Sequence, residues 1–202
     1  MLFKMKMRIQ GIWDFLGIPF RFILFDQEWL PVFHWTTLED ERLGKALPYI
    51  KGELLDIGSG TNKLVQTYGN GIGVDVFDWG GGTIVVKDTA SLGYADGSFD
   101  TITFIACLNH IPNREDVVRE VWRLLRPNGR AIVTMINPVL GIIGHKLWWY
   151  SEDKKRGGMQ KGEVGGMWNS NIVDLFNRQG FRLDGIFKFE YGLNNMLIFR
   201  KT

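Results

Sequence analysis

Apolar residues along this chain form two kinds of pattern, short continuous runs and stretches with helical spacing. The continuous runs predict five strands, at residues 53–57, 71–76, 83–87, 99–105 and 130–136. The helically spaced stretches predict four helices, at residues 37–49, 62–68, 114–125 and 169–179. Because strands and helices alternate, the pattern predicts an α/β domain whose sheet is mainly parallel and carries helices on both faces.

The C-terminal part of the chain departs from this alternation. Residues 181–190 and 195–200 have the pattern of two strands joined by a short turn, which predicts an antiparallel hairpin. Together with the five earlier runs, the hairpin gives a sheet of seven strands. The chain has no internal repeat and no linker, so we expect a single domain over residues 1–202.

The run from Glu53 to Asn62 joins an apolar strand to a helix through a glycine turn. Gly58 and Gly60 carry no Cβ, so the backbone can turn tightly there and approach a ligand closely. Asp75 follows Gly58 by 17 residues, at the end of the next strand, where a carboxylate can accept hydrogen bonds from ribose hydroxyls. Lys63 stands where a nicotinamide-binding fingerprint needs its third glycine. A hydride-transfer enzyme is therefore disfavoured, and another adenosine-bearing cofactor stays open.

Four stretches of the chain resemble motifs of the class I S-adenosylmethionine-dependent methyltransferases, nearest to the broad branch that includes the quinone and sterol C-methyltransferases. They are residues 54–61, 73–75, 87–92 with 95–100, and 124–130, in order over about residues 50–137. The resemblance implies a Rossmann-like, doubly wound α/β fold with a mainly parallel seven-stranded sheet and a C-terminal antiparallel hairpin. It also implies S-adenosyl-L-methionine as the cofactor.

For the methionine part of the cofactor, the resemblance assigns contacts to the first motif. The residues that would surround it are Asp56, Gly58, Ser59 and Gly60. The family usually has a third glycine where this chain has Asn62, whose side chain we expect to take up space near the methionine end of the cofactor. Asparagine tolerates left-handed backbone, so the turn can survive the change.

For the adenosine part, the resemblance assigns contacts to the next motifs. Asp75 would hold the ribose, and Val76 would pack on the adenine. Asp88 would face the adenine amino group with Thr89 beside it, and Ile105 would form the floor of the site. Both acids have a plainer alternative, since Asp75 can cap the end of a strand and Asp88 can form a turn.

Sites for methyl transfer from a sulfonium often lack a catalytic residue that the sequence can identify. The methyl group is already activated, so the protein need only position the acceptor and exclude water. His110 follows the strand at 99–105, and loops at the carboxyl ends of parallel strands face the ligand crevice. Its unperturbed pKa of about 6.5 suits a general base, so His110 is the candidate catalytic residue. The alternative is that His110 lines the pocket without taking part in the chemistry.

Two segments outside the motifs are rich in aromatic residues. Residues 1–36 fit neither a signal peptide nor a membrane span, because charged residues and a proline interrupt them. We favour a lid over the substrate side, and the alternative is an interfacial segment with Lys4, Lys6 and Arg8 at lipid headgroups. Residues 137–167 form a connection too long for an ordinary loop. We expect this insertion to cover the substrate side and to close one apolar pocket together with the N-terminal segment.

Composition excludes several kinds of partner. The formal net charge of +2 is too small for a nucleic-acid-binding face, so we expect no nucleic acid partner. Cys107 is the only cysteine, which excludes an internal disulfide and fits a reducing, cytoplasmic compartment. No His or acid stands at ligand spacing around it, so we expect no metal site. Residues 80–82 are three glycines that precede a strand, and we interpret them as a turn rather than a phosphate cradle.

The sequence leaves three interpretations of function. The leading one is a methyltransferase that uses S-adenosylmethionine to methylate a small-molecule or lipid-like acceptor. A second is a non-catalytic methyltransferase-like binding module, which only Asn62 favours. The third is a special case of the first, an enzyme for a quinone or lipid precursor with peripheral membrane contact through residues 1–35. The sequence identifies neither the acceptor atom nor the oligomeric state.

Overall fold

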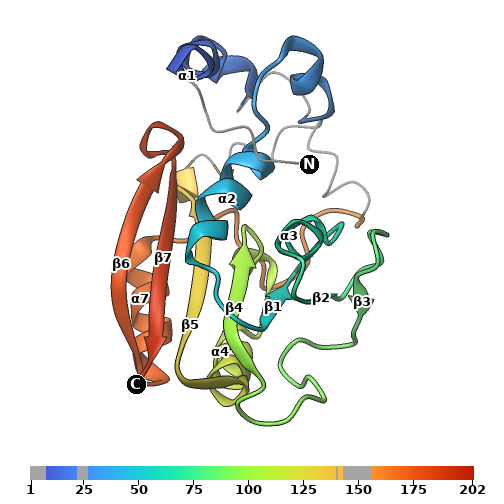
Figure 1. The fold of residues 1–202 in the computed structure, drawn as a ribbon, viewed down its shortest axis with the longest axis vertical. Helices are drawn as coiled ribbons and strands as arrows, with labels where there is room; N and C mark the ends of the chain where they lie inside the picture. Colours follow the sequence, from blue (N-terminus) through green and yellow to red (C-terminus); the bar gives the residue numbers. More distant parts are fainter. Residues whose placement is uncertain (1–7, 22–26, 140, 143–155) are drawn as a thin grey trace.

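The computed structural model describes residues 8–21, 27–139, 141–142 and 156–202. At its centre is a seven-stranded sheet with the strand order β3-β2-β1-β4-β5-β7-β6 (Figure 1). The pairings among β1 to β5 are parallel, whereas β7 runs antiparallel to both β5 and β6. The predicted fold class is therefore confirmed. The strands are β1 (Leu54–Ile57), β2 (Gly71–Asp75), β3 (Ile84–Val85), β4 (Phe99–Ile105), β5 (Leu125–Ile136), β6 (Phe181–Phe189) and β7 (Asn194–Lys201).

Helices cover both faces of the sheet, as predicted. One face packs against α4 and α7, and the other packs against α2 and α3. Alternate residues of a strand point to opposite faces, so Leu54 lies in one core and Leu55 in the other. The helices are α1 (Arg8–Leu16), α2 (Leu38–Ala46), α3 (Lys63–Tyr68), α4 (Arg114–Leu124) and α7 (Asn169–Arg178), with 3₁₀ turns η2 (Gln27–Phe33), η3 (Leu47–Tyr49), η4 (Leu108–His110) and η5 (Glu190–Gly192).

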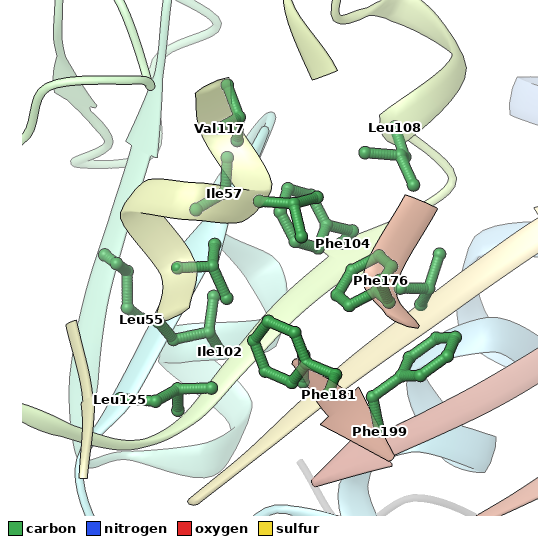
Figure 2. Packing of buried hydrophobic residues seen from close by; sticks show 14 of the residues in the cluster. Leu55, Ile57, Ile102, Phe104, Leu108, Val117, Leu125, Phe176, Phe181 and Phe199 are labelled. Carbon is green, nitrogen blue, oxygen red and sulfur yellow. The ribbon is translucent and has the colours of Figure 1, made fainter. Parts of the chain in front are cut away.

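The larger core lies under α4 and α7, and aromatic rings fill its centre (Figure 2). Phe176 of α7 stacks on Phe199 of β7 with ring centroids 4.2 Å apart, and Phe181 of β6 meets Phe176 edge-on. These rings join the C-terminal hairpin to the parallel strands through Phe104 of β4. The C-terminal segment is therefore part of the main core.

The structure differs from the predicted elements in two places, the start of β5 and the length of β3. β5 begins at Leu125 rather than 130, because Leu125 pairs with Phe99 ahead of a bulge that includes Asn128 at φ +63°. β3 is only two residues long and exposed, because it forms the open edge of the sheet. The connections β2–β3 and β3–β4, residues 76–83 and 86–98, contain no helix. Loops therefore border the sheet at β2 and β3.

The sequence pattern did not predict α1. We use the name cap for residues 8–21 and 27–36, which contain α1 and η2 and lie at the end of the molecule toward which β4 and β6 point (Figure 1). The cap contacts the rest of the molecule at α2 and at η5, where the Tyr191 hydroxyl donates to the Gly11 carbonyl over 3.0 Å. Within the described ranges, no helix is long and apolar enough to cross a membrane.

Candidate functional site

The glycine turn after β1 is fixed by hydrogen bonds to the end of β2. The N–H groups of Gly58 and Ser59 donate to the Val74 carbonyl over 2.8 and 3.1 Å. The Gly60 N–H donates to Asp75 Oδ2 over 3.0 Å. The sequence motif therefore becomes a turn that holds the Asp75 carboxylate against the Gly60 backbone.

Gly58 and Gly60 both have left-handed φ angles, +70° and +53°, but their surroundings differ. A Cβ at Gly58 would lie 2.6 Å from the Cβ of Cys107, so Gly58 is needed where the turn meets the loop after β4. A Cβ at Gly60 would meet no atom within 4 Å, so the space beside Gly60 is open. Cys107 itself donates from Sγ to the Ile57 carbonyl over 2.8 Å. Burial, with a further effect of the Asp56 and Asp75 charges, raises the pKa of its thiol well above the ordinary value, so the thiol is unreactive at neutral pH.

Asn62 takes the left-handed conformation that a third glycine would take, with φ +62° and ψ +21°. Its side chain turns toward β2 and the 80–82 loop, where Nδ2 donates to the Gly82 carbonyl over 3.2 Å. Oδ1 lies so close to Gly73 that a Cβ there would be 2.0 Å away. The side chain therefore packs against β2 and the 80–82 loop. The three glycines at 80–82 all have φ above +70° and form a turn, as predicted.

Asp56 lies in β1, buried beside Thr103 of β4, whose hydroxyl donates to Asp56 Oδ1 over 2.6 Å. Burial raises the pKa of the Asp56 carboxyl to about 7; the Thr103 hydrogen bond opposes this rise and the charge of Asp75 adds to it. A cationic group bound nearby would lower this pKa and favour the carboxylate. Asp56 is therefore able to receive the ammonium of an amino-acid ligand.

Asp75 is buried at the end of β2, and each of its oxygens accepts one backbone hydrogen bond. Oδ2 accepts from Gly60 and Oδ1 accepts from Phe77, each over 3.0 Å. A carboxylate oxygen has capacity for a further bond, so Asp75 can also accept from ribose hydroxyls. The neighbouring Val76 is 55% exposed and offers an apolar surface to an adenine ring.

Asp88 lies three residues beyond β3 and is exposed. Its Oδ1 accepts from the Ala90 N–H over 2.8 Å, as a turn-forming acid does. Asn113, ahead of α4, donates from Nδ2 to both Asp88 oxygens over 3.2 Å. Thr89 is buried beside it. The carboxylate is thus placed between the β3 and β4 loops, with room for further hydrogen bonds.

The chain turns sharply where β4 ends. Ile105 packs toward α2 and α3, and Ala106 has a left-handed φ of +55°. The Ala106 N–H donates to Thr134 Oγ1 over 3.0 Å, which ties this turn to β5. No sequence pattern predicted this turn, because alanine rarely adopts this conformation and Thr134 is 28 residues away.

His110 lies in η4, just beyond this turn, and the segment after β5 surrounds it. Its Nδ1 lies 3.2 Å from Glu163 Oε2 and 3.1 Å from Arg156 Nη2. A protonated Nδ1 would donate to Glu163, whereas an unprotonated Nδ1 would accept from Arg156. Burial would raise the pKa of Glu163, but the bonds from Arg156 and His110 outweigh it and leave that pKa below its usual value.

Residues 156–167 are anchored on the loop that carries His110. Asn109 pairs with Val164 through two hydrogen bonds of 3.0 and 3.1 Å. Arg114 donates to the Asn109 carbonyl and to the Gly162 carbonyl, over 2.8 and 2.9 Å. Much of the predicted insertion, residues 140 and 143–155, lies outside the described residues. No local pattern could have identified Glu163 and Arg156 as partners of His110, because they lie 53 and 46 residues from it in sequence, respectively.

A second feature at the same edge of the sheet is a groove of about 620 Å³ between the cap, α2 and the end of β6. Glu190 lies in it, 3% exposed and at a left-handed φ of +48°. Burial raises the pKa of Glu190 to about 7, while the nearby Arg42 charge lowers it. Oε2 accepts from Asn194, whereas the buried Oε1 has no hydrogen-bond partner among the described residues. The lining residues are Gly11, Ile12, Phe15, Glu41, Lys45, Phe189, Glu190 and Tyr191.

Residues 55–133, which run from β1 into β5, match a protein family described as a methyltransferase domain. Over this stretch the chain is similar to methyltransferase domains. The stretch contains the glycine turn, Asp75, Asp88 and His110, so the candidate site lies within the matched part.

Similar proteins agree with this assignment. A demethylmenaquinone methyltransferase of Lactobacillus johnsonii is 37% identical over 65 residues, which are 32% of this chain and 26% of that protein. The chain spans less than half the length of the curated relatives it matches. A Thermotoga maritima structure, described as an S-adenosylmethionine-dependent methyltransferase and possible histamine N-methyltransferase, superimposes with a TM-score of 0.59 at 17% identity, covering 95% of this chain and 99% of that chain.

The [4+2]-cyclase SpnF superimposes with a TM-score of 0.61 at 16% identity, covering 80% of each chain. At these identities the structural likeness shows the fold alone. Because a cyclase shares the fold, the fold by itself does not fix the reaction.

Proposed function

We propose that this protein transfers the methyl group of S-adenosylmethionine to a small-molecule or lipid-class acceptor. The observation that carries the proposal is the glycine turn, in which Gly60 faces open space and Asp75 is held beside it. S-adenosylmethionine supplies an electrophilic methyl group on a sulfonium, so the protein must bind it, align the acceptor and exclude water.

Each part of the cofactor has a proposed binding residue. Asp56 would receive the ammonium of the methionine part, and the backbone of Gly58, Ser59 and Gly60 would approach its carboxylate. Asp75 would accept hydrogen bonds from the ribose hydroxyls, with Val76 against the adenine. The side chains that would complete the adenine end are Asp88 and Thr89, with Ile105 as the floor.

The acceptor is proposed to bind in the groove between the cap and β6. Its volume of about 620 Å³ lies in the range of small-molecule sites. Its walls are mostly apolar, from Ile12, Phe15 and Phe189, and Glu190 adds a carboxyl group that can donate or accept a proton near neutral pH. An apolar ring or chain with one polar group, as in a quinone precursor, fits these walls.

His110 is proposed to take the proton that an acceptor hydroxyl or acidic carbon loses. Glu163, whose Oε2 lies 3.2 Å from Nδ1, would hold the imidazole in place. The alternative role, lining the pocket, predicts that His110→Gln lowers binding without changing the pH dependence of turnover. A loss of the acidic limb of the pH–rate profile would support the role as a base.

The non-catalytic alternative rests on Asn62, whose Nδ2 donates to the Gly82 carbonyl over 3.2 Å. A methyl-transfer assay distinguishes the methyltransferase from the non-catalytic module. The protein is incubated with methyl-labelled S-adenosylmethionine and fractionated membrane lipid, protein and nucleic acid, and label is followed by chromatography and mass spectrometry.

The proposal expects label in a lipid or small-molecule product and at least tenfold less label with Asp75→Ala. Label confined to protein or nucleic acid would contradict the acceptor class. Cofactor binding without transfer to any fraction would favour the non-catalytic module.

A further inference from the structure

Helix α1 has its apolar side toward solvent. Five large apolar residues of this nine-residue helix are between 46% and 76% exposed. A helix on the surface of a soluble protein ordinarily turns its apolar face to the core and its polar face to water. In α1 the arrangement is reversed. The exposed residues are Ile9, Ile12, Trp13, Phe15 and Leu16.

The polar side of α1 is held inside by a specific network. Asp14 is fully buried and accepts from the Thr36 N–H and the Thr36 hydroxyl, over 2.9 and 2.8 Å. Gln10 donates to the same carboxylate and to the His34 carbonyl. Arg21, also fully buried, bonds to the Thr36 carbonyl and to Glu41 of α2. Rotating α1 to bury its apolar side would break these bonds, so the orientation is fixed.

The turn η2 extends the apolar surface. Trp29 and Val32 are 61% and 64% exposed. Trp13 of α1 donates from its indole to the Phe33 carbonyl over 3.0 Å, so the two elements form one unit. We call Ile9, Ile12, Trp13, Leu16, Trp29 and Val32 the cap face. This unit lies at one end of the long axis of the molecule (Figure 1).

We propose that the cap face docks on the surface of a lipid bilayer, with its side chains at the boundary between headgroups and acyl chains. Large exposed apolar surfaces mark interaction sites, and two exposed tryptophans suit the bilayer interface. The sequence directly before the helix adds the complementary charge. Residues 1–8 contain Lys4, Lys6 and Arg8 and no acidic residue, as expected beside anionic headgroups.

Docking would place the acceptor groove next to the membrane. The role of this groove in binding the acceptor rests on the proposed function. Ile12 contributes to both the cap face and the groove wall, so the two surfaces meet there. An apolar acceptor dissolved in the bilayer could then reach the groove without crossing water. The docking itself requires only the cap face.

Vesicle flotation tests the docking with the full chain. The vesicles are phosphatidylcholine alone and phosphatidylcholine with phosphatidylglycerol. The test variant is Ile9→Asn/Leu16→Asn, and the control is Ile84→Asn/Ile186→Asn, which replaces two isoleucines of 48% and 42% exposure elsewhere. Circular dichroism, titration with S-adenosylmethionine and sedimentation velocity are measured for each protein.

We expect wild type and control to float with both vesicle types, more strongly with the anionic one, and the test variant to bind about tenfold or more weakly. Absence of wild-type flotation, or equal flotation of the test variant, would overturn the proposal. A wild-type dimer that the test variant abolishes, without flotation, would instead assign the cap face to a second copy of the chain. Flotation does not depend on turnover, so its failure and the failure of the methyltransferase proposal are distinct results.

Discussion

The glycine turn and the cap both bury carboxylates, and they do so in opposite surroundings. In the turn, Asp56 and Asp75 lie at the ends of strands above an apolar core, next to open space at Gly60. In the cap, Asp14 and Arg21 form the interior, and apolar side chains form the outer surface. The first arrangement leaves hydrogen-bonding capacity for a ligand. The second uses that capacity inside the protein and leaves apolar area exposed.

This difference indicates what each region can bind. A charged, hydrogen-bonding ligand needs acceptors that are fixed but not fully used, as at Asp75. An apolar partner needs exposed side chains on a rigid support, as on α1. The following predictions test whether the two regions are independent and whether each is built as described.

The largest effect is expected from Arg21→Met. It removes a fully buried guanidinium and leaves Asp14 and Glu41 without its charge, which typically costs about 3–5 kcal/mol. The cap should open locally, seen as faster hydrogen exchange at residues 9–17, while affinity for S-adenosylmethionine stays within about twofold. The control Arg182→Met, at an exposed pair, should cost less than about 1 kcal/mol. Loss of cofactor binding in Arg21→Met would show that the regions are coupled.

The next effect compares Gly58→Ala with Gly60→Ala. Both add a Cβ to left-handed backbone, at about 1–2 kcal/mol. Only Gly58→Ala adds a clash with Cys107, so we expect about 2–4 kcal/mol of lost stability there. Chemical denaturation measures both, and Gly58→Ala/Cys107→Gly should recover part of the loss. Equal costs for the two single variants would refute the packing role of Gly58.

Asp56→Asn should change how stability depends on pH. The pKa of Asp56 in the folded protein is about 7, above the ordinary value of 3.8. The contribution of Asp56 to stability is therefore complete below about pH 3.8 and is lost as the pH rises to 7. Relative to wild type, the variant should gain stability as the pH rises from about 4 to 7, and should show no further gain above pH 7.

The control for this experiment is Asp184→Asn, which should give the opposite sign. The Arg200 guanidinium holds the pKa of Asp184 below its usual value, so that contribution is lost as pH falls. Urea denaturation across this pH range measures both variants. A pH-independent difference for Asp56→Asn would mean that Asp56 is ionised throughout.

The smallest effect is expected from Asn62→Gly. The variant loses the Nδ2 bond to Gly82 and gains a residue suited to the left-handed conformation, so stability should change by less than about 1 kcal/mol. Because the side chain packs against Gly73 and the 80–82 loop, we expect affinity for S-adenosylmethionine to change less than about threefold. Calorimetric titration decides this, and a tenfold change in either direction would show that Asn62 contacts or blocks the cofactor.

Much of the fold could be predicted from the sequence, because its signals are local. A sheet covered by helices produces continuous apolar runs in its strands and helical spacing in its helices. Such runs occur at β1, β4 and β5, and such spacing occurs in α4. The ends of elements were less predictable, as at Leu125, where pairing with Phe99 extends β5 beyond its apolar run. The pattern of α1 could not tell which side faces inward, because that depends on Thr36, 22 residues from Asp14.

In the candidate site, too, the parts that depend on local sequence could be predicted and the parts that depend on distant residues could not. The glycine turn and Asp75 follow a fixed spacing, so the sequence predicted that they meet, and the structure brings them within 3.0 Å. The surroundings of His110 come from Glu163 and Arg156, which no local pattern connects to it. Glu190 was also missed, because its burial depends on the packing of β6 against α2 and the cap.

The most direct test of the account is calorimetric titration of S-adenosylmethionine into wild type, Asp75→Ala and Asp78→Ala. Asp78 lies in the same loop but accepts only from the exposed Gly80 N–H over 2.9 Å, which makes it a matched control. We predict that Asp75→Ala weakens binding by about 1.5–3 kcal/mol, the range for hydrogen bonds to a charged group, and that Asp78→Ala binds within about twofold of wild type. Absence of binding by wild type at about millimolar cofactor, or equal affinity of all three proteins, would contradict the account.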